Sequence, residues 1–442
     1  MKSFFIKTYG CQMNERDSER MAGFLLDQGF RPAASEAEAD LILVNTCSIR
    51  EKPEQKVYST LGRLSQLKQA RPGTILAVTG CVAQQEGGRL LERVPGLDLA
   101  IGTHALHRLP ELLKRVSEGR HLAETGWLKP DDPGLFEIPS PRPQGGVTAF
   151  VTIMQGCDNY CAYCVVPYVR GRERSRPAEE VLAEVESLAA GGVKEVTLLG
   201  QNVNTYGPSN GAGIGFPELL RRVAEVPGLE RVRFTTSHPK DLSDRLIEVM
   251  AEHPKVMEHI HLPVQAGSDR VLRAMNRGYT REHYLERVRA LRRAMPEAGL
   301  TTDLIVGFPG EREADFKETL ALMGEAEYDE SYSFRFSTRP LTAAGRMEGQ
   351  LPEETKLERL YRLQALQAEI TERKHQAQVG SVHEVLVEGR SKTDAGRETG
   401  RSRTNRPVHV PAGDQERRGR IIPVRITRAL KHSLVGEVLG EE

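Results

Sequence analysis

The sequence lacks the long apolar runs that mark membrane spans and secretion signals. Of its 442 residues, 39% are hydrophobic, and no window approaches the roughly eighteen consecutive apolar residues of a membrane-spanning helix. The first residues, MKSFFIKTYGC, contain an apolar run of only three, which is too short for the core of a signal peptide. We therefore expect a cytoplasmic protein without a membrane partner.

The sequence also lacks net charge. Its 61 Lys and Arg residues balance its 61 Asp and Glu residues, so the formal net charge at pH 7 is zero. Any affinity for nucleic acid must therefore come from local segregation of charge. Residues 390–431 show such segregation, because they hold twelve Arg or Lys residues against four Asp or Glu residues.

Cysteine is scarce, with six residues in the chain. In the reducing cytoplasm disulfides are rare, so these thiols point to metal binding or catalysis. Cys157, Cys161 and Cys164 fall within eight positions, whereas Cys11, Cys47 and Cys81 are widely spaced.

Residues 1–125 alternate apolar strands with helical patterns, which is typical of a parallel sheet covered by helices on both faces. The expected strands are 3–10, 39–46, 74–80 and 97–102, and the expected helices lie near 15–29, from 51 onward, at 84–94 and at 106–116. Cys11, Cys47 and Cys81 each follow a strand. The carboxyl ends of parallel strands share one edge, where ligands bind, so we expect these thiols to form one site with three ligands and one vacancy.

The rest of the chain predicts a linker and two further domains. Residues 126–145 are rich in Pro and Gly and predict a linker. In residues 146–378 the alternation resumes, which predicts a partial barrel of six strand–helix units with its chemistry in the loops after the strands, followed by a trailing helix at 352–378. Residues 379–442 hold short β-type runs and predict a small β-barrel. The expected barrel strands are 148–154, 193–200, 230–237, 256–264, 300–308 and 329–336.

The cysteine cluster follows the first strand of the predicted barrel, and its spacing is C-x3-C-x2-C. A zinc site normally closes with four ligands, and no fourth Cys or His stands nearby. Three thiolates suit a 4Fe–4S cluster in which one iron stays open to a cofactor or substrate. A zinc knuckle or a set of buried structural thiols is the alternative.

The spacing, with Tyr163 before the third cysteine, resembles the radical S-adenosylmethionine superfamily. Eight segments, in order along the whole chain, resemble the methylthiotransferases: YGCQMNERDSE, VNTCSIRE, TGCVAQ, QGCDNYCAYCVVPYVRGRERSR, LLGQNVNTYG, TSHP, HLPVQAGSDRVLRAMNRGYTRE and TDLIVGFPGE. This resemblance implies an N-terminal methylthiotransferase domain at 1–125, a radical S-adenosylmethionine core at 146–378 and a TRAM domain at 379–442.

The resemblance also implies the chemistry. Cys157, Cys161 and Cys164 would be the catalytic residues that hold a radical-generating 4Fe–4S cluster with S-adenosylmethionine on its open iron. Cys11, Cys47 and Cys81 would hold an auxiliary 4Fe–4S cluster implicated in sulfur delivery. In such enzymes sulfur is inserted at an unactivated C–H bond and then methylated. We expect an electron donor, a possible sulfur donor and a monomeric enzyme.

Contacts to S-adenosylmethionine are expected at the strand ends. The candidates are Tyr163, Gln201, Asn202, Ser237 and Gln265, although each could equally be an ordinary polar residue of the barrel rim. Two positions depart from the family pattern: Leu341 replaces a usual glycine in STRPLTAA, and Ala266 replaces a common serine in HLPVQAGS.

The substrate branch is predicted from the C-terminal region. GRSRTNRPVHV (400–410) resembles the branch that modifies isopentenyl-adenosine beside the tRNA anticodon, and cations there suit phosphate contacts. The candidate RNA-binding residues are Arg401, Arg403, Asn405 and Arg406. The arginines of RGRERSR (170–176) either contact RNA or cofactor, or brace the cysteine loop. The alternatives are threonylcarbamoyl-adenosine in tRNA, a ribosomal-protein aspartate, or a zinc-holding RNA-binding protein without catalysis.

Overall fold

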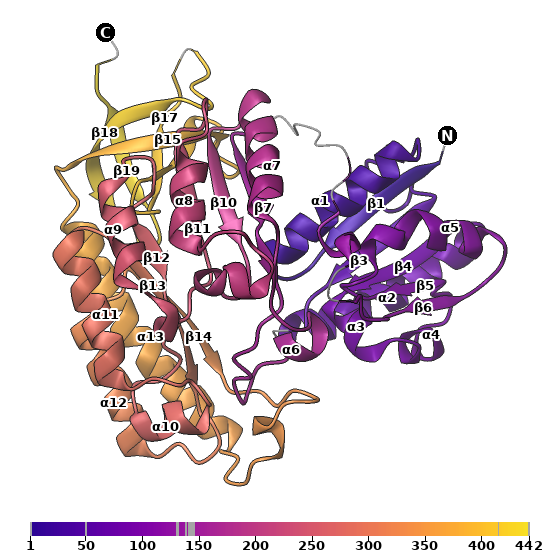
Figure 1. Ribbon diagram of the computed structural model, residues 1–442, viewed down its shortest axis with the longest axis horizontal. Helices are drawn as coiled ribbons and strands as arrows, with labels where there is room; N and C mark the ends of the chain where they lie inside the picture. The colour runs from indigo at the N-terminus through magenta and orange to yellow at the C-terminus, as the bar shows by residue number, and fades with distance from the viewer. Residues whose placement is uncertain are drawn as a thin grey trace.

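The computed structural model describes residues 2–48, 51–129, 132–137, 139, 146–413 and 415–440. In Figure 1 the N-terminal domain, a sheet with flanking helices, lies at the right of the molecule. A curved set of strands and helices forms the middle, and a five-stranded barrel forms the C-terminal end. This confirms the predicted fold class of a parallel-sheet domain, a partial strand–helix barrel and a small β-barrel.

The N-terminal sheet is parallel throughout, in the order β2-β1-β3-β4-β5-β6. Helices cover both of its faces because its central strands are apolar on both sides. In β3, Leu41 and Leu43 pack toward α1 and α5, while Ile42 and Val44 pack toward α2, α3 and α4. The strands are β1 Ser3–Thr8, β2 Arg31–Pro32, β3 Leu41–Thr46, β4 Ile75–Gly80, β5 Leu99–Ile101 and β6 Leu122–Glu124. The helices are α1 Gln12–Asp27, α2 Glu51–Ala70, α3 Cys81–Glu86, α4 Arg89–Arg93 and α5 Leu109–Ser117.

Two features of this domain differ from the sequence prediction. The single helix expected at 84–94 is two helices, because Gly87 adopts a left-handed φ of +54° and ends α3. The short edge strands β2 and β6 carry too few apolar residues to be visible in the hydrophobic pattern.

The middle of the chain forms the partial barrel. Its strands pair in parallel as β7-β10-β11 and β12-β13-β14, and the pairing of Val232 with Val256 joins the two groups. The barrel strands are β7 Thr148–Thr152, β10 Glu195–Leu199, β11 Arg231–Phe234, β12 His259–His261, β13 Gly299–Val306 and β14 Glu330–Arg335. The longer helices around them are α7 Ala178–Ala190, α8 Phe216–Ala224, α9 Asp244–Glu252, α11 Arg281–Ala294, α12 Glu313–Ala326 and α13 Glu353–Gln376. The short elements are β8 Met154–Gln155, β9 Arg174–Ser175, α6 Val166–Val169 and α10 Asp269–Ala274.

Single-turn 3₁₀ segments occur in the connections. They are η1 Leu106–Arg108, η2 Pro133–Leu135, η3 Val203–Thr205, η4 Pro208–Asn210, η5 Pro239–Asp241 and η6 Ala344–Arg346.

The C-terminal strands close into a barrel in the order β15-β16-β17-β19-β18. Its core is built from the inward-facing apolar residues of alternating strands, such as Val385, Val408 and Val424. Strand β16, with the sequence RETGRS, was not expected because polar residues and a glycine hide its alternation. The strands are β15 Val382–Arg390, β16 Arg397–Ser402, β17 Pro407–Pro411, β18 Ile421–Ala429 and β19 Leu434–Val438.

The loop between β16 and β17, residues 402–406, inserts at the amino ends of the middle-barrel strands, and we call it the docking loop. At the start of β13, Gly299 leaves room for this loop, since a Cβ there would lie 2.5 Å from the backbone oxygen of Thr404. The guanidinium of Arg233 donates to the backbone oxygens of Ser402 and Arg403 at 2.7 and 3.2 Å. The C-terminal barrel is therefore locked to the middle barrel by backbone carbonyls.

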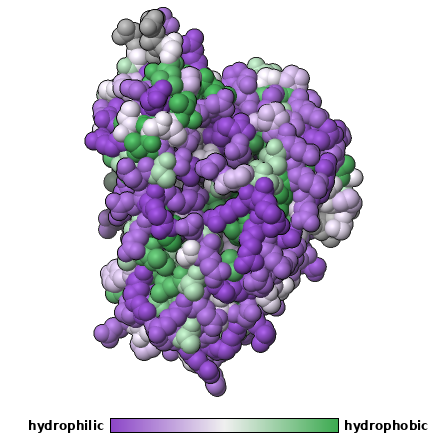
Figure 2. All heavy atoms as spheres, turned by 90° about the vertical axis from the view of Figure 1, so that its left-hand side faces the viewer, coloured by the Kyte–Doolittle hydropathy of each residue, from purple (hydrophilic) through white to green (hydrophobic). Residues whose placement is uncertain are grey.

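The outer surface is polar. Figure 2 shows hydrophilic side chains over most of the face that lies at the left of Figure 1, with hydrophobic side chains gathered in small patches. Among the described residues, every helix is too short or too polar to span a membrane.

Candidate functional site

Cys11, Cys47 and Cys81 meet at one edge of the N-terminal sheet. They follow β1, β3 and β4, which are neighbours in the sheet, at the carboxyl ends of these strands. The thiols of Cys11 and Cys47 are hydrogen-bonded to each other. The structure thus brings together the three widely spaced cysteines, which we call the N-terminal triad.

Two glycines allow the loops of the N-terminal triad to approach so closely. A Cβ on Gly10 would collide with the Cβ of Cys47, and a Cβ on Gly80 would lie 2.5 Å from the backbone oxygen of Thr46. Both glycines adopt left-handed φ angles, +132° and +89°, which other residues rarely adopt. A larger residue at either position would separate the thiols.

A buried pair of asparagines fixes the same loops, and sequence reasoning missed it. Asn14 donates to the backbone oxygen of Thr46 at 2.8 Å, and Asn45 donates to the backbone oxygen of Asn14 at 2.8 Å. The Cys11 thiol donates to Oδ1 of Asn14 at 3.3 Å. Both asparagines lie within the motifs YGCQMN and VNTC, so their nearness to the cysteines was the available signal.

Cys157, Cys161 and Cys164, which we call the core triad, lie in the loop that follows β7 and β8. A Cβ on Gly156 would collide with the backbone oxygen of Arg172, and the amide of Cys157 donates to the backbone oxygen of Gly171 at 3.1 Å. The amide of Gly156 also donates to Oε1 of Gln201 at 2.6 Å. The loop is thus held in place from both sides, by residues 171–172 and by the strand end after β10.

The two triads adjoin across the interface between the domains. Helix α6 follows Cys164 directly and packs on α3, which begins at Cys81. Val165 and Val169 bury the Cys81 side chain. Two backbone oxygens at the end of this segment are also bound by the N-terminal domain. The Thr103 hydroxyl donates to the backbone oxygen of Val169 at 2.5 Å, and Nε2 of His104 lies 3.0 Å from the backbone oxygen of Arg170.

Three of the four arginines in RGRERSR brace the structure. Arg170 is buried and pairs with Asp17 of α1 at 2.8 Å. Arg176 pairs with the buried Glu184, which also pairs with Arg16 of α1. Arg174 donates to the backbone oxygen of Asp132 at 2.9 Å. The side chain of Arg172, in contrast, is 74% exposed, with Asp158 at 2.6 Å.

The thiols differ in acidity within the N-terminal triad as well as between the triads, since burial raises the pKa of Cys81. Burial raises the pKa of Cys157 to about 11, and burial together with the neighbouring Cys161 raises that of Cys164 to about 12. The hydrogen bond from Cys47, helped by the charge of Arg170, lowers the pKa of Cys11 to about 6. Metal ligation needs thiolates, so loading of the core triad must release protons.

The donor sets fit iron–sulfur clusters. Each triad offers three thiols and no fourth cysteine, which suits a four-iron cube with one open iron. Among the described residues, no three His, Cys, Asp or Glu side chains converge on a single metal ion. It is the thiol chemistry of the triads that suits them to iron–sulfur ligation.

The strand ends around the core triad carry unpaired polar groups. The Ser237 hydroxyl, Nε2 of His238 and both side-chain atoms of Asn204 are buried without a hydrogen-bond partner in the described structure. These residues follow β11 and β10, on the rim that carries the cysteine loop. Such groups fit a polar cofactor like S-adenosylmethionine. Asn204 and His238 were missed by sequence reasoning, although both lie in the motifs LLGQNVNTYG and TSHP.

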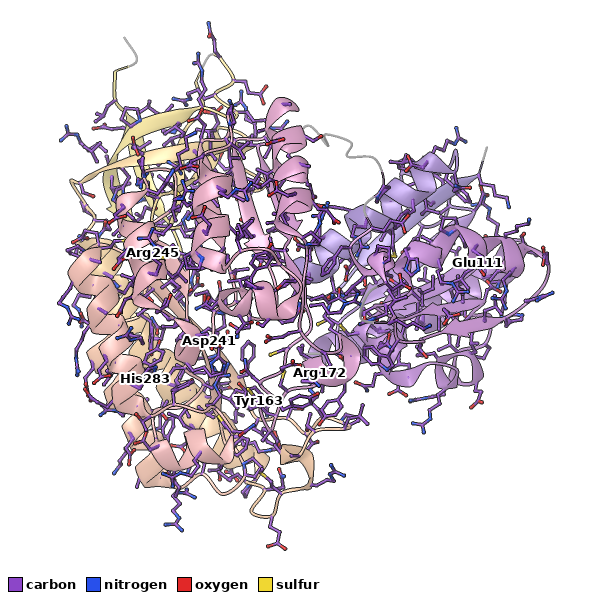
Figure 3. All side chains as sticks on the ribbon, in the orientation of Figure 1. Glu111, Tyr163, Arg172, Asp241, Arg245 and His283 are labelled. Carbon is purple, nitrogen blue, oxygen red and sulfur yellow. The ribbon has the colours of Figure 1, made fainter. Side chains whose placement is uncertain are left out.

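The other predicted cofactor contacts take different positions. The Asn202 side chain is engaged on both atoms, because Nδ2 donates to Asp241 at 2.8 Å and Oδ1 accepts from the backbone amide of His238 at 3.1 Å. Gln265 is buried with a left-handed φ of +72° after β12. Tyr163 accepts from Arg277 at 3.3 Å. In Figure 3, Tyr163 lies between Asp241 and Arg172 at the strand-end side of the barrel, while Glu111 lies far out on the N-terminal domain.

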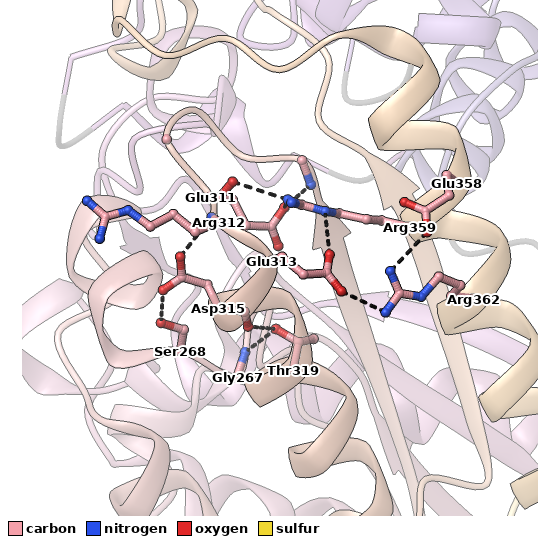
Figure 4. Close-up of polar contacts among 12 residues, drawn as sticks. Gly267, Ser268, Glu311, Arg312, Glu313, Asp315, Thr319, Glu358, Arg359 and Arg362 are labelled. Carbon is pink, nitrogen blue, oxygen red and sulfur yellow. Dashed lines mark hydrogen bonds and ion pairs between the residues drawn. The ribbon is translucent and has the colours of Figure 1, made fainter.

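The rim loops after β12 and β13 are anchored to α12 and α13 (Figure 4). Ser268 donates to Asp315 at 2.7 Å, and Arg359 donates to Glu311 at 2.9 Å in a buried ion pair. Gly307, at a φ of +73°, leaves no room for a Cβ beside Lys356 of α13. The segment GFPG (307–310) thus ties the trailing helix to the rim.

The predicted RNA-binding residues lie at the docking loop, and two of them face the middle barrel. Arg406 is only 6% exposed and pairs with Asp329 at 2.5 Å, so its guanidinium is turned toward the middle barrel and away from the outer surface. Arg403 pairs with Glu258 at 3.0 Å and donates to the backbone oxygen of Pro254 at 2.8 Å. These two arginines hold the C-terminal barrel in place.

Arg401 and Asn405 stay accessible beside a groove. The groove, of about 910 Å³, runs between the C-terminal barrel, β14 and α13, and it is away from both triads. Arg401, Asn405, Lys431 and Tyr332 are among its lining residues. Asn405 adopts a left-handed φ of +68° at the turn, and Arg401 donates to its backbone oxygen at 3.2 Å.

Comparisons with known proteins agree with this architecture. Residues 3–102 match "Uncharacterized protein family UPF0004", residues 151–323 match "Radical SAM superfamily" and residues 376–439 match "TRAM domain". The chain is 51% identical over 439 residues to a tRNA-2-methylthio-N(6)-dimethylallyladenosine synthase of Syntrophotalea carbinolica, covering 99% of this chain and 100% of that protein. It is 52% identical over 437 residues to the same-named protein of Geobacter metallireducens, covering 99% and 98%.

Solved structures show the same fold at low identity. The radical S-adenosylmethionine methyltransferase TsrM from Kitasatospora setae matches with a TM-score of 0.61 and 15% identity, over 78% of this chain and 77% of that one. The cobalamin-dependent radical enzyme OxsB matches with a TM-score of 0.53 and 12% identity, over 83% and 56%.

Proposed function

The chain belongs to the tRNA-2-methylthio-N(6)-dimethylallyladenosine synthase family of radical S-adenosylmethionine enzymes, and on this premise we propose that it transfers a methylthio group to carbon 2 of isopentenyl-adenosine in tRNA. Full-length identity of about one half to proteins of that name supports the substrate. The observation that carries the proposal is the adjacency of two thiol triads across the interface of the N-terminal domain and the barrel.

The core triad holds the 4Fe–4S cluster to which S-adenosylmethionine binds. When bound, the cluster and cofactor supply the radical that takes hydrogen from carbon 2 of the adenine, and a second S-adenosylmethionine supplies the methyl group. Gln201 fixes the backbone of the cysteine loop at Gly156. Ser237, His238 and Asn204 have buried polar atoms without a partner in the described structure, and these atoms would bind the cofactor. Asn202 is a positioning residue, because its side-chain amide holds His238 and Asp241 of the neighbouring loop.

We propose that the N-terminal triad holds a second 4Fe–4S cluster, which delivers sulfur. Its support is the geometry: three thiols on adjacent strand ends, separated from the core triad by the packing of α6 on α3. The guanidinium of Arg170 pairs with Asp17 and interacts electrostatically with the thiols of Cys81 and Cys11.

The substrate RNA is proposed to lie along the groove at the C-terminal barrel. Arg401 and Lys431 line it and provide cations for phosphates. Asn405 provides an amide for a base edge. The electron donor, the sulfur donor, the monomeric state and the cytoplasmic location remain predictions from the sequence.

The substrate is tested by nucleoside mass analysis of tRNA from a strain that lacks the gene. The methylthio derivative of isopentenyl-adenosine should be absent and the unmodified isopentenyl-adenosine should accumulate. The wild-type gene should restore the methylthio group, whereas the Cys157→Ala, Cys161→Ala, Cys164→Ala variant should not. Unchanged isopentenyl-adenosine modification, with a loss at threonylcarbamoyl-adenosine or at a ribosomal protein, would contradict the proposal.

The number of clusters is tested by iron analysis after anaerobic reconstitution. Two four-iron clusters require about eight irons per chain, and removal of either triad should leave about half. The variant without the N-terminal triad should still cleave S-adenosylmethionine but should not thiolate tRNA. A variant without the N-terminal triad that retains all of its iron would show that this triad holds no cluster.

A further inference from the structure

The core triad has a buried positive neighbour, Arg277, that the sequence did not single out. Its guanidinium is 5% exposed and donates from Nη1 to the sulfur of Cys161 at 3.3 Å. The same Nη1 lies 3.3 Å from the Tyr163 hydroxyl, Nη2 donates to the backbone oxygen of Pro263 at 2.7 Å, and Nε donates to the Tyr279 hydroxyl at 3.0 Å. All three nitrogens of the guanidinium are therefore positioned by hydrogen bonds.

The segment that carries Arg277 is built against the cysteine loop. Helix α10 ends at Ala274, and Asn276 then adopts a left-handed φ of +58°. The Asn276 amide donates to the backbone oxygens of Asn159 and Tyr160 at 3.2 and 3.1 Å. The backbone oxygen of Met275 accepts from the amide of Ala162 at 2.9 Å. The end of α10 thus holds the loop backbone, and this contact aims the next side chain at the thiol.

Arg277 lacks the partner that a buried cation needs. No carboxylate lies within ion-pair distance of it in the part of the chain that the structure describes, and its protein partners are a carbonyl, two phenols and a thiol. Most other buried arginines pair with carboxylates, as do Arg170, Arg176, Arg359, Arg406 and Arg417. Among the described residues Arg231 is the exception, since its guanidinium donates to two backbone oxygens, but no metal ligand lies among its partners. Because an unpaired buried charge is costly, the site calls for an anion beside Cys161.

A 4Fe–4S cluster with three thiolate ligands is such an anion, and each electron that it accepts makes it more negative. Hydrogen bonds to cluster sulfurs and nearby positive charge both favour the reduced state and raise the reduction potential. We propose that Arg277 is the counter-ion of the core cluster, and that it stabilises the reduced state from which S-adenosylmethionine is cleaved. This inference rests on the proposed radical chemistry. With cluster and cofactor bound, one electron from an external low-potential donor would serve to break the sulfonium bond to the 5′-carbon, and Arg277 would stabilise the negative charge that this electron adds beside Cys161.

The test is a redox titration of the holoenzyme. The reduced core cluster is monitored by the electron paramagnetic resonance signal that changes on addition of S-adenosylmethionine. That signal identifies the core cluster in the presence of any second cluster. Arg277→Gln should lower the ratio of reduced to oxidised core cluster about tenfold at a fixed potential, which corresponds to about 59 mV for a one-electron couple. Arg277→Lys keeps the charge and should lose less than the glutamine variant.

The matched control is Arg172→Gln, which removes an exposed arginine from the cysteine loop itself. Solvent screens that charge, so the midpoint potential should stay at the wild-type value. An unshifted midpoint in an iron-replete Arg277→Gln protein would overturn the proposal. A shift of equal size in the Arg172 control would overturn it too, since any loss of positive charge on the molecule would then suffice.

Cleavage of S-adenosylmethionine without tRNA gives a second measure that is independent of the substrate. The rate lost in Arg277→Gln should be recovered, at least in large part, when a stronger reductant replaces dithionite. Equal losses with both reductants would indicate a merely structural role and contradict the proposal. If the wild-type protein had a core cluster with the expected midpoint potential but failed to thiolate tRNA, that result would instead contradict the proposed function.

A measurement on the native protein covers the case in which the variants do not bind iron. Arginine labelled with ¹⁵N in its guanidinium should give a hyperfine coupling to the reduced core cluster, through the hydrogen bond to Cys161. Absence of that coupling from the signal that responds to S-adenosylmethionine would refute the contact.

Discussion

At the scale of single residues, the backbone at Leu341 explains a departure from the family pattern. Leu341 has a φ of +71° and follows Pro340 in a turn in which the amide of Thr342 bonds to the backbone oxygen of Arg339 at 3.4 Å. Such a turn with proline second favours glycine third. The usual glycine of the family thus has a conformational reason, and in this chain the loop keeps its shape against the preference of leucine.

Leu341→Gly should therefore stabilise the protein. The left-handed conformation costs leucine about 1–2 kcal/mol, and glycine removes this cost. Glycine loses more backbone entropy on folding, which offsets about 0.5–1 kcal/mol of the gain in stability. We expect the free energy of unfolding, measured in denaturant, to rise by about 0.5–1 kcal/mol. Leu341→Ala keeps the Cβ and the strain, and because the leucine is 52% exposed the alanine variant should match the wild type. A gain of equal size in both variants would mean that exposure of leucine, and not its φ, is responsible.

Buried histidines make stability depend on pH. Burial, with the charges of Arg233 and His261, lowers the pKa of His259 to about 3; Asp329 opposes this shift and Arg401 adds to it. The unfolded chain binds the proton near pH 6.5, so below that pH the unfolded state gains protons and stability falls, until the effect levels off near pH 3. His259→Gln should reduce the loss of unfolding free energy between pH 7 and pH 5 by about 2 kcal/mol. An identical loss in wild type and variant would show that His259 titrates normally.

At the scale of elements, the docking loop makes a tight backbone contact with β13. Gly299→Ala would place a Cβ 2.5 Å from the backbone oxygen of Thr404, and a clash of this kind costs about 1–3 kcal/mol. The clash favours an open state in which the C-terminal barrel is undocked from the middle barrel, by about 1.4 kcal/mol. We therefore expect limited proteolysis to cleave the connection between α13 and β15, residues 377–381, about tenfold faster. Gly324→Ala in α12, where a Cβ would meet nothing within 4 Å, is the control and should be cleaved at the wild-type rate.

Much of the element pattern could be predicted from the sequence. The apolar strands of both sheets and the long helices follow from periodicity, and this was enough to place Cys11, Cys47 and Cys81 at one edge. Short or polar elements could not be predicted, because β6 has three residues and β16 shows no apolar alternation. Side-chain roles that depend on distant segments could not be predicted either. Arg406 and its partner Asp329 are 77 residues apart in the chain, and Arg277 and Cys161 are 116 residues apart.

At the scale of the whole molecule, charge on the C-terminal barrel divides into docking and accessible cations. Arg403 and Arg406 serve the contact between the barrels, so only the accessible cations of the groove test RNA binding without undocking the domain. Arg401→Gln with Lys431→Gln should reduce the slope of log affinity against log salt by about 1.4–1.8, at about 0.7–0.9 per lost phosphate contact. Cleavage of S-adenosylmethionine without tRNA should be unchanged, because the groove is away from both triads.

The control for this prediction is Arg390→Gln with Lys392→Gln. These two exposed cations belong to the same basic stretch but do not line the groove. Their loss should leave the salt slope for tRNA unchanged. If both double variants reduce the slope equally, the RNA follows the basic face of the barrel and not the groove.

The buried arginine Arg231 has a consequence for synthesis of the chain. Its guanidinium is 1% exposed, and its hydrogen bonds go to the backbone oxygens of Arg401 and Glu384, 170 and 153 residues further along. Until β15 and β16 have been synthesised, this cation has neither of these two acceptors. In a truncated product that ends before β15, the guanidinium of Arg231 therefore lacks both of its backbone acceptors. Only a chain that contains the C-terminal barrel can satisfy this arginine of the middle barrel in the way seen here.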